Sequence, residues 1–139
     1  MSERSQKLIA IRPVIPTARV SENMSDDERF QNQTLRPIIK LQNNLLLFAF
    51  QNYISKRKNV FYELSLQKRM DYIAHAVHKD LKFRNSLKGM VIGHYTLKEY
   101  EIYILNSSAL NKRMMNMVTK RLQDQIQFFE EEAMVKITF

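Results

Sequence analysis

Apolar residues recur along most of the chain at intervals of three and four, the spacing that places side chains on one face of an α-helix. The pattern defines three long stretches, at about 25–54, 65–91 and 108–129, and one short stretch at about 96–105. Connections of roughly 3–9 residues, a common length between the helices of bundles, join these stretches. The pattern therefore predicts an all-α fold, a small helical bundle of three long helices and one short helix.

The first predicted helix begins at Ser25, where a capping box is expected. The Ser25 hydroxyl accepts from the amide of Glu28, and the Glu28 side chain reaches back. Pro37 lacks an amide hydrogen, so we expect the helix to kink or restart near residue 36. Its apolar seam is expected to consist of Ile38, Leu41, Leu45 and Phe48. Further apolar residues beside this seam favour a central position in the bundle.

The second predicted helix starts after Ser65, a suitable N-cap residue, and continues to Val91 without interruption. Gly93 is placed to end it in the left-handed conformation that glycine adopts easily. The buried face of this helix is expected to consist of Leu66, Met70, Ile73, Val77 and Leu81.

Two more helices are predicted in the C-terminal third. A short helix opens at Thr96, which forms a second capping box with Glu99. A polar turn ends it, and Ser107 or Ser108 is expected to cap the last helix. The acidic run at 130–132 is unfavourable at a helix C-terminus, so we expect fraying there. The buried side of the last helix is expected to carry Leu110, Met114, Met117 or Val118, Leu122, Ile126 and Phe129.

The two ends of the chain lack this regular pattern. Pro13 and Pro16 oppose a regular helix through residues 1–24, which we expect to form an extended, flexible arm. Residues 25–134 are predicted to form one bundle domain, followed by a short tail at 135–139.

Composition narrows the possible functions. The chain has 139 residues, two glycines and no cysteine. Nucleotide folds with a glycine-built phosphate loop are poorly served by two glycines, and disulfides and thiolate metal sites are excluded. No apolar run approaches the length of a membrane span and no targeting segment is apparent, so we expect a cytoplasmic protein that does not bind membranes.

Positive charge is concentrated in two segments of a chain with a formal net charge of +8. Nine cations and three acids give residues 56–95 a net charge of +6, and four cations without an acid give residues 106–122 a net charge of +4. Such segments can neutralise the phosphates of nucleic acid, and the predicted helices resemble a helix-turn-helix array. Nucleic-acid binding is therefore an alternative function. Its expected phosphate contacts are Lys82, Arg84, Lys88, Lys112 and Arg113.

Residues that could support catalysis are few. Asp71, His75 and His78 are spaced by four and three, so they share the outward face of the second predicted helix. These are zinc-ligand types, but no fourth ligand accompanies them. No serine lies in a nucleophile elbow. The sequence therefore favours a non-enzymatic protein with no catalytic residue, no metal and no cofactor.

The two glycines suggest an interface. Gly89 and Gly93 are four residues apart, so they share a helix face on which another backbone can approach closely. Alternatively, Gly93 caps its helix and Gly89 relieves crowding against a neighbouring helix. Met90 lies beside Gly89, and Met115 points away from the seam of the last helix, where we expect an exposed apolar patch. The main hypothesis is a helical protein-interaction module whose partner is another protein or a second copy.

Three stretches of the chain, at 25–47, 82–93 and 106–124, together with Ile11-Arg12-Pro13, resemble a family of small basic bacterial proteins of no established function. The resemblance covers nearly the whole chain. Members of that family often carry the label "glyoxalase", so the resemblance implies a third possible function, that of a glyoxalase-type lyase. The label brings no motif that maps onto this chain, and no catalytic residue is carried over from it.

Overall fold

A computed structural model describes residues 1–16 and 19–130. Every regular element in this part of the chain is a helix, which confirms the predicted all-α class. The α-helices are α1 (Glu3–Ala10), α2 (Asp26–Phe30), α3 (Arg36–Leu41), α4 (Asn43–Lys56), α5 (Leu66–Lys79), α6 (Leu81–Ile92), α7 (Leu97–Leu105) and α8 (Ser107–Asp124). A π-helix, η1 (Gln31–Leu35), and two 3₁₀-helices, η2 (Val60–Glu63) and η3 (Ile126–Phe129), complete the set. The predicted tail at 135–139 and the predicted fraying at 131–132 lie outside the described residues.

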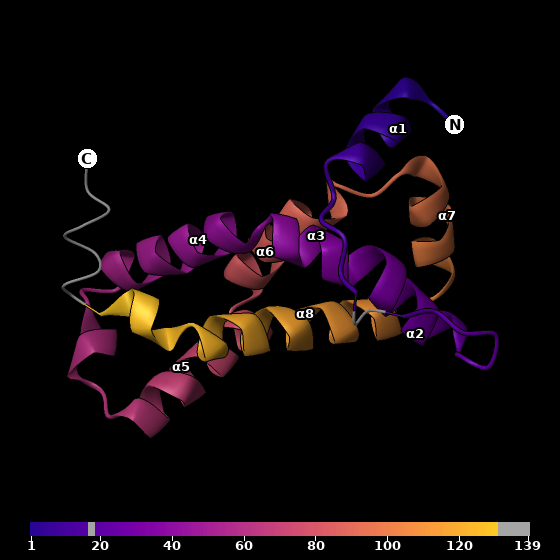
Figure 1. The fold of residues 1–139 in the computed structure, drawn as a ribbon. Helices are drawn as coiled ribbons and strands as arrows, with labels where there is room; N and C mark the ends of the chain where they lie inside the picture. The colour runs from indigo at the N-terminus through magenta and orange to yellow at the C-terminus, as the bar shows by residue number, and fades with distance from the viewer. Residues whose placement is uncertain (17–18, 131–139) are drawn as a thin grey trace.

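The longest helix, α8, runs along the bundle, and the other helices pack around it (Figure 1). Helix α5 lies against its C-terminal half, α4 and α6 also pack on it, and α2, η1 and α7 meet its N-terminal half. The first two predicted long helices are each broken into shorter ones. The predicted arrangement of three long helices and one short helix is therefore wrong.

The first predicted helix is divided at two places. Pro37 lies in the first turn of α3, where proline is tolerated because an amide there has no partner within the helix. The preceding turn widens into the π-helix η1. The amide of Arg36 accordingly donates to the carbonyl of Gln31, five residues back. The restart expected near residue 36 is thus confirmed. A second break at Gln42 separates α3 from α4.

The buried face of α4 differs from the predicted seam. A continuous helix would bury Leu45 and Phe48 together with Ile38, but these two side chains are 46% and 42% exposed. The core side of α4 is formed instead by Leu46, Leu47, Phe50, Tyr53 and Ile54. The predicted seam is therefore wrong beyond residue 41, because the core side of α4 is formed by the residues next to the predicted ones.

The second predicted helix is broken at Asp80, which adopts an extended conformation and caps α6 by accepting from the amide of Phe83. The same carboxylate accepts from the hydroxyl of Tyr53 and forms an ion pair with Arg57, both at 2.9 Å. These bonds favour the break over a continuous helix. Because Leu66 and Leu81 now lie at helix N-termini, they are exposed and do not belong to the predicted buried face.

The expected helix caps are partly confirmed. Ser25 and Ser65 accept from the amides three residues on, and the capping box of Thr96 and Glu99 is present. Helix α8 starts after Asn106 without a side-chain cap, so the caps predicted at Ser107 and Ser108 are wrong. The side-chain amide of Asn106 instead donates to the Asp27 carboxylate at 3.1 Å. This bond ties the turn between α7 and α8 to α2.

The N-terminal arm is not extended throughout, because α1 forms before the prolines. Ser2 caps this helix by accepting from the amide of Ser5, and Pro13 and Pro16 lie beyond its end. Arg4 fixes α1 to the loop between α6 and α7 by donating to the carbonyls of Tyr95, at 2.8 Å, and Gly93, at 2.9 Å. The arm is therefore anchored at α1 by long-range hydrogen bonds.

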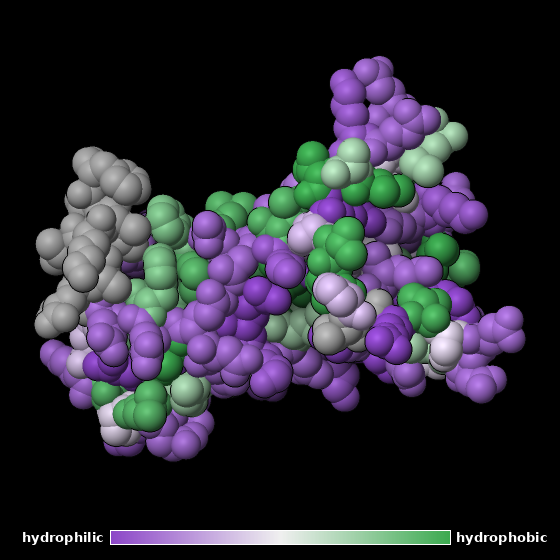
Figure 2. Space-filling model, viewed as in Figure 1, coloured by the Kyte–Doolittle hydropathy of each residue, from purple (hydrophilic) through white to green (hydrophobic). Residues whose placement is uncertain are grey.

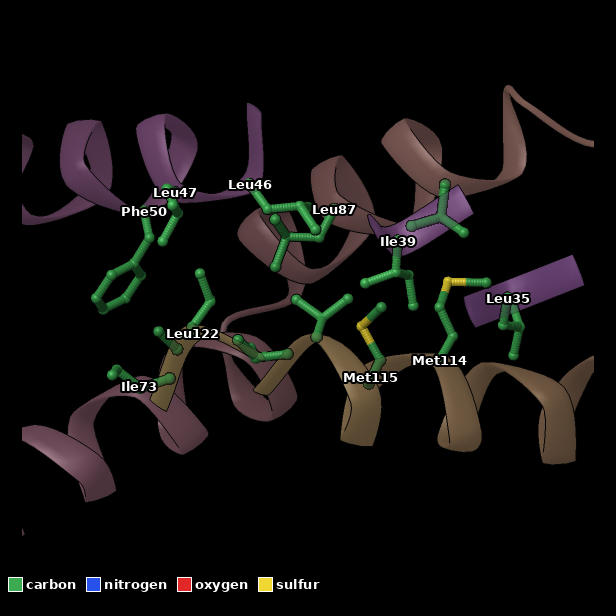
Figure 3. Packing of buried hydrophobic residues seen from close by; sticks show 14 of the residues in the cluster. Leu35, Ile39, Leu46, Leu47, Phe50, Ile73, Leu87, Met114, Met115 and Leu122 are labelled. Atoms are coloured by element: carbon green, nitrogen blue, oxygen red, sulfur yellow. The ribbon is translucent and has the colours of Figure 1, made fainter. Parts of the chain in front are cut away.

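The core lies between α8 and the helices around it (Figure 3). Its residues labelled in Figure 3 are Leu35, Ile39, Leu46, Leu47, Phe50, Ile73, Leu87, Met114, Met115 and Leu122. The predicted buried side of α8 is confirmed at Leu110, Met114, Val118, Leu122 and Phe129.

Candidate functional site

An ion pair joins the N-terminal arm to the start of α7. Arg12 donates to both carboxylate oxygens of Glu99, at 2.6 and 2.7 Å, and to the carbonyl of His94 at 2.9 Å. The hydroxyl of Thr34 donates to the same carboxylate at 2.7 Å, so η1 is held as well. Both side chains of the pair are largely removed from solvent. We call these three residues, Arg12, Thr34 and Glu99, the latch.

The latch keeps Glu99 charged inside the protein. Burial acts to raise the pKa of the Glu99 carboxyl, but the hydrogen bonds from Arg12, from the Thr96 amide and from Thr34 outweigh it. Its pKa therefore lies below the ordinary value of glutamic acid. A carboxylate so fully engaged is a structural group rather than a general acid or base, because its oxygens already accept these bonds.

An apolar groove with a cavity volume of about 980 Å³ lies next to the latch, between α1, α2, α7 and the start of α8. Its floor is made of the buried side chains of Phe30 and Leu110, and Ile9, Leu97, Ile102 and Leu105 form its walls. Figure 2 shows that apolar residues reach the surface at this end of the molecule. We call this feature the α1–α7 groove.

Helix α7 exposes most of its apolar side chains, although it is among the most apolar helices of the chain. Tyr103 is its buried hydrophobic residue, and the Tyr103 hydroxyl donates to Asn111 of α8 at 2.7 Å. Leu105 is 83% exposed. The other exposed large apolar residues of α7 are Leu97, Tyr100, Ile102 and Ile104. A helix that is apolar on nearly all sides is normally buried, so α7 lacks a cover in the single chain.

The charges around the groove balance. Arg12 neutralises Glu99 within the latch. Besides Glu99, the charged side chains of the lining are Asp26, Asp27, Arg29 and Lys98. With Arg12 paired to Glu99 from outside the lining, these side chains sum to no formal net charge, in a chain whose total is +8. The groove is therefore a surface that a second copy of the chain can approach without strong repulsion.

This groove is not among the sites predicted from the sequence. The run Tyr100-Glu101-Ile102-Tyr103-Ile104-Leu105 is nearly continuous in apolar residues, which was the available signal. A helix of nine residues has one buried face, so this run has more apolar side chains than α7 can bury against α8. The other wall could not be found from local pattern, because Ile9 lies about 90 residues away in a segment expected to be extended.

The interface expected at Gly89, Met90, Gly93 and Met115 is not one surface. Met115 is fully buried in the core, so its predicted exposure is wrong; the face of α8 that it shares with Thr119 packs inward. Gly93 has a right-handed helical conformation, so the predicted left-handed cap is also wrong. A Cβ atom at Gly89 would meet nothing within 4 Å, so no other segment of residues 1–16 and 19–130 approaches closely there. Met90 is half-buried against the core.

The three candidates for a metal site do not converge. His78 is turned toward α8, where its Nε2 lies 3.1 Å from the hydroxyl of Thr119, so its predicted outward orientation is wrong. Asp71 accepts from the side chain of Gln67, and His75 is exposed. Across residues 1–16 and 19–130, no three histidine, aspartate or glutamate side chains are grouped as a metal ion requires.

The expected phosphate contacts are divided between α6 and α8. Lys82 and Lys112 are exposed, and Lys88 is partly covered. Burial lowers the pKa of the His78 imidazole, and the nearby charge of Arg84 lowers it further. Arg113 donates to the side chain of Gln31 in η1 at 2.7 Å. Arg113 is thus bonded to η1 while Arg84 lies near α5, and a shared nucleic-acid surface stays a prediction.

No protein family, no curated protein and no solved structure matches this chain. None of the helices in the described ranges has the length and hydropathy of a membrane span. Evidence about function therefore comes from the α1–α7 groove and the other surfaces of this chain.

Proposed function

We propose that this protein is a non-enzymatic helical interaction module that pairs with a second copy of itself through the α1–α7 groove. The observation that carries the proposal is the exposure of five large apolar residues on the nine-residue helix α7. Exposed apolar surface of this kind is removed from water most simply by association, at about 25 cal/mol for each Å² buried.

Two properties of the groove favour a second copy as the partner. The molecule presents both a hollow, the groove, and an apolar helix beside it, so a twofold axis lets α7 of each chain enter the groove of the other. The side chains of the groove and its latch also sum to no formal net charge, whereas the chain as a whole carries +8.

Two leucines allow a matched test. Leu97 and Leu66 are each 63% exposed and each is the first residue of its helix, α7 and α5. Glutamate is tolerated at that position because it interacts well with the helix dipole, so both Leu97→Glu and Leu66→Glu are expected to fold. Leu97 lines the groove and Leu66 does not.

Sedimentation velocity at protein concentrations from 1 to 100 μM, chosen to span ordinary dimer affinities, measures the result. We expect the wild-type chain and Leu66→Glu to form dimers. Leu97→Glu is expected to weaken dimerisation at least about tenfold, since a carboxylate would lose water in the interface. A wild-type chain that is monomeric throughout, or an equal effect of both substitutions, would contradict the proposal.

A further inference from the structure

A second hollow, with a cavity volume of about 440 Å³, lies between α3 and the C-terminal half of α8, away from the α1–α7 groove. The surface over this part of the two helices is hydrophilic in the view of Figure 2. Its charged residues are Arg36, Lys40, Lys120, Arg121 and Asp124. We call this hollow the basic pocket.

The cations of the basic pocket come from both of its walls. Arg36 and Lys40 are four residues apart on α3, and Lys120 and Arg121 are consecutive on α8. Among the described residues that line the pocket, the one carboxylate is Asp124, which lies 3.2 Å from the ammonium of Lys120. Four cations against one carboxylate leave an excess of positive charge facing a small hollow.

The two arginines are held by neutral partners. Arg121 donates to the side-chain oxygen of Asn43 at 3.2 Å, and Arg36 donates to that of Asn32 at 2.8 Å. Burial lowers the pKa of Arg121, and the charge of Arg36 acts in the same direction while Asp124 opposes it. The amide partners position the guanidinium groups without neutralising them.

We propose that the basic pocket binds a phosphate-bearing ligand. Guanidinium groups present paired donors that match the oxygens of a phosphate, and lysine adds a point charge. The volume lies within the range of small-ligand sites, roughly 300–1,000 Å³. A bound dianion would relieve the repulsion among the four cations, which is the source of its affinity.

This site is separate from the phosphate contacts expected from sequence. None of Lys82, Arg84, Lys88, Lys112 and Arg113 lines the basic pocket. Arg36 and Lys40 belong to a stretch whose pattern predicts an apolar central helix, and the sequence does not predict a site for their charges. Only the packing of α3 beside α8 brings them to Lys120 and Arg121.

Variants that replace lysine by neutral glutamine test the pocket without disturbing its arginines. Lys40→Gln with Lys120→Gln removes one cation from each wall, and both lysines are exposed. Lys56→Gln with Lys68→Gln removes the same charge from exposed positions elsewhere. Isothermal titration calorimetry is performed on all three full-length proteins with sodium tripolyphosphate and, separately, with a six-nucleotide oligodeoxythymidylate. Sodium sulfate at matched ionic strength replaces the ligand in a blank titration.

We expect saturable binding to the wild-type chain that is weakened at least about tenfold in the pocket variant and within about twofold in the control variant. Binding of tripolyphosphate identifies a free phosphate compound as the source, whereas binding of the oligonucleotide alone identifies a nucleic-acid backbone. Equal weakening in both variants would show a response to net charge only and would overturn the proposal, as would the absence of binding to both probes.

Discussion

Aromatic rings pack most densely at the end of the molecule where α4, α5, α6 and η3 meet. The end formed by α1, α2 and α7 also has ring contacts, among them Phe30 with Tyr95 and Tyr95 with Tyr103, but polar side chains tie its elements together. At the first end, Phe50 lies within 5.0–6.2 Å of the rings of Phe61, Tyr72 and Phe129. At the second end, the latch and the two hydrogen bonds of Arg4 connect the elements. We call these the aromatic end and the groove end.

The two ends differ in whether their apolar side chains are buried in the core or remain on the surface. The aromatic end uses its rings for folding, and its core residues are almost completely buried. The groove end is positioned by directional bonds, and its leucines and isoleucines stay on the surface. Polar anchoring thus leaves apolar side chains available for binding, which hydrophobic anchoring would not.

Loss of the latch is the largest effect expected at the groove end. Glu99→Ala leaves Arg12 buried without its partner and removes the capping box of α7, at a cost of about 3 kcal/mol in the free energy of unfolding. Urea denaturation measures this loss. Hydrogen exchange is expected to increase in α1 and α7 while α4 and α5 stay protected.

Glu101→Ala is the control, because Glu101 is exposed on the same helix and its removal should change stability by less than about 0.5 kcal/mol. If Glu99→Ala accelerates exchange equally in α4 and α5, the two ends are one cooperative unit and the comparison fails.

Much of the bundle follows from local signals in the sequence. The caps at Ser25, Ser65 and Thr96 and the buried side of α8 depend on residues within a few turns of one another, so they could be predicted. The breaks at Gln42 and Asp80 could not, because no glycine or proline marks them. Asp80 is stabilised by Tyr53 of α4 and by Arg57 just after that helix, 27 and 23 residues away.

The groove lay beyond such signals for the same reason. Arg12 and Glu99 are 87 residues apart, and nothing in the local pattern of either segment indicates the other. The apolar excess of α7 was visible in the sequence, but its exposure depends on what packs nearby. A local pattern shows which residues are apolar, and tertiary packing decides which of them remain uncovered.

Removing the hydroxyl of one tyrosine at each end is expected to change the free energy of unfolding in different directions, by a smaller amount. The hydroxyl of Tyr53 at the aromatic end donates to Asp80 at 2.9 Å, and burial together with this bond raises the pKa of Tyr53 to about 12. Tyr53→Phe should therefore destabilise the protein by about 1 kcal/mol.

The hydroxyl of Tyr95 at the groove end is buried without a hydrogen-bond partner among the described residues. Tyr95→Phe removes that cost, so we expect an unchanged or higher free energy of unfolding, by up to about 1 kcal/mol. Thermal and urea denaturation of the two variants, which differ from the wild type by one oxygen atom each, provide the comparison. Destabilisation by Tyr95→Phe equal to that by Tyr53→Phe would show that the Tyr95 hydroxyl is satisfied in solution.

Mild acid should produce the smallest effect, and at the groove end it acts on His94. Burial lowers the pKa of this imidazole, and the nearby charges of Arg12 and Arg4 lower it further. Because the folded protein favours the neutral form, its contribution to stability is complete above the unfolded pKa of 6.5 and is lost as the pH falls below that value. We expect a loss below about 1 kcal/mol between pH 7.5 and 5.5 in urea denaturation.

His94→Gln should reduce this loss and His75→Gln, at an exposed position of α5, should not. The loss that remains in His94→Gln belongs to other groups, among them His78, whose pKa is also lowered by burial. If His94→Gln retains the whole loss, acid destabilises the molecule elsewhere, and the groove end does not respond to pH through its anchoring arginines.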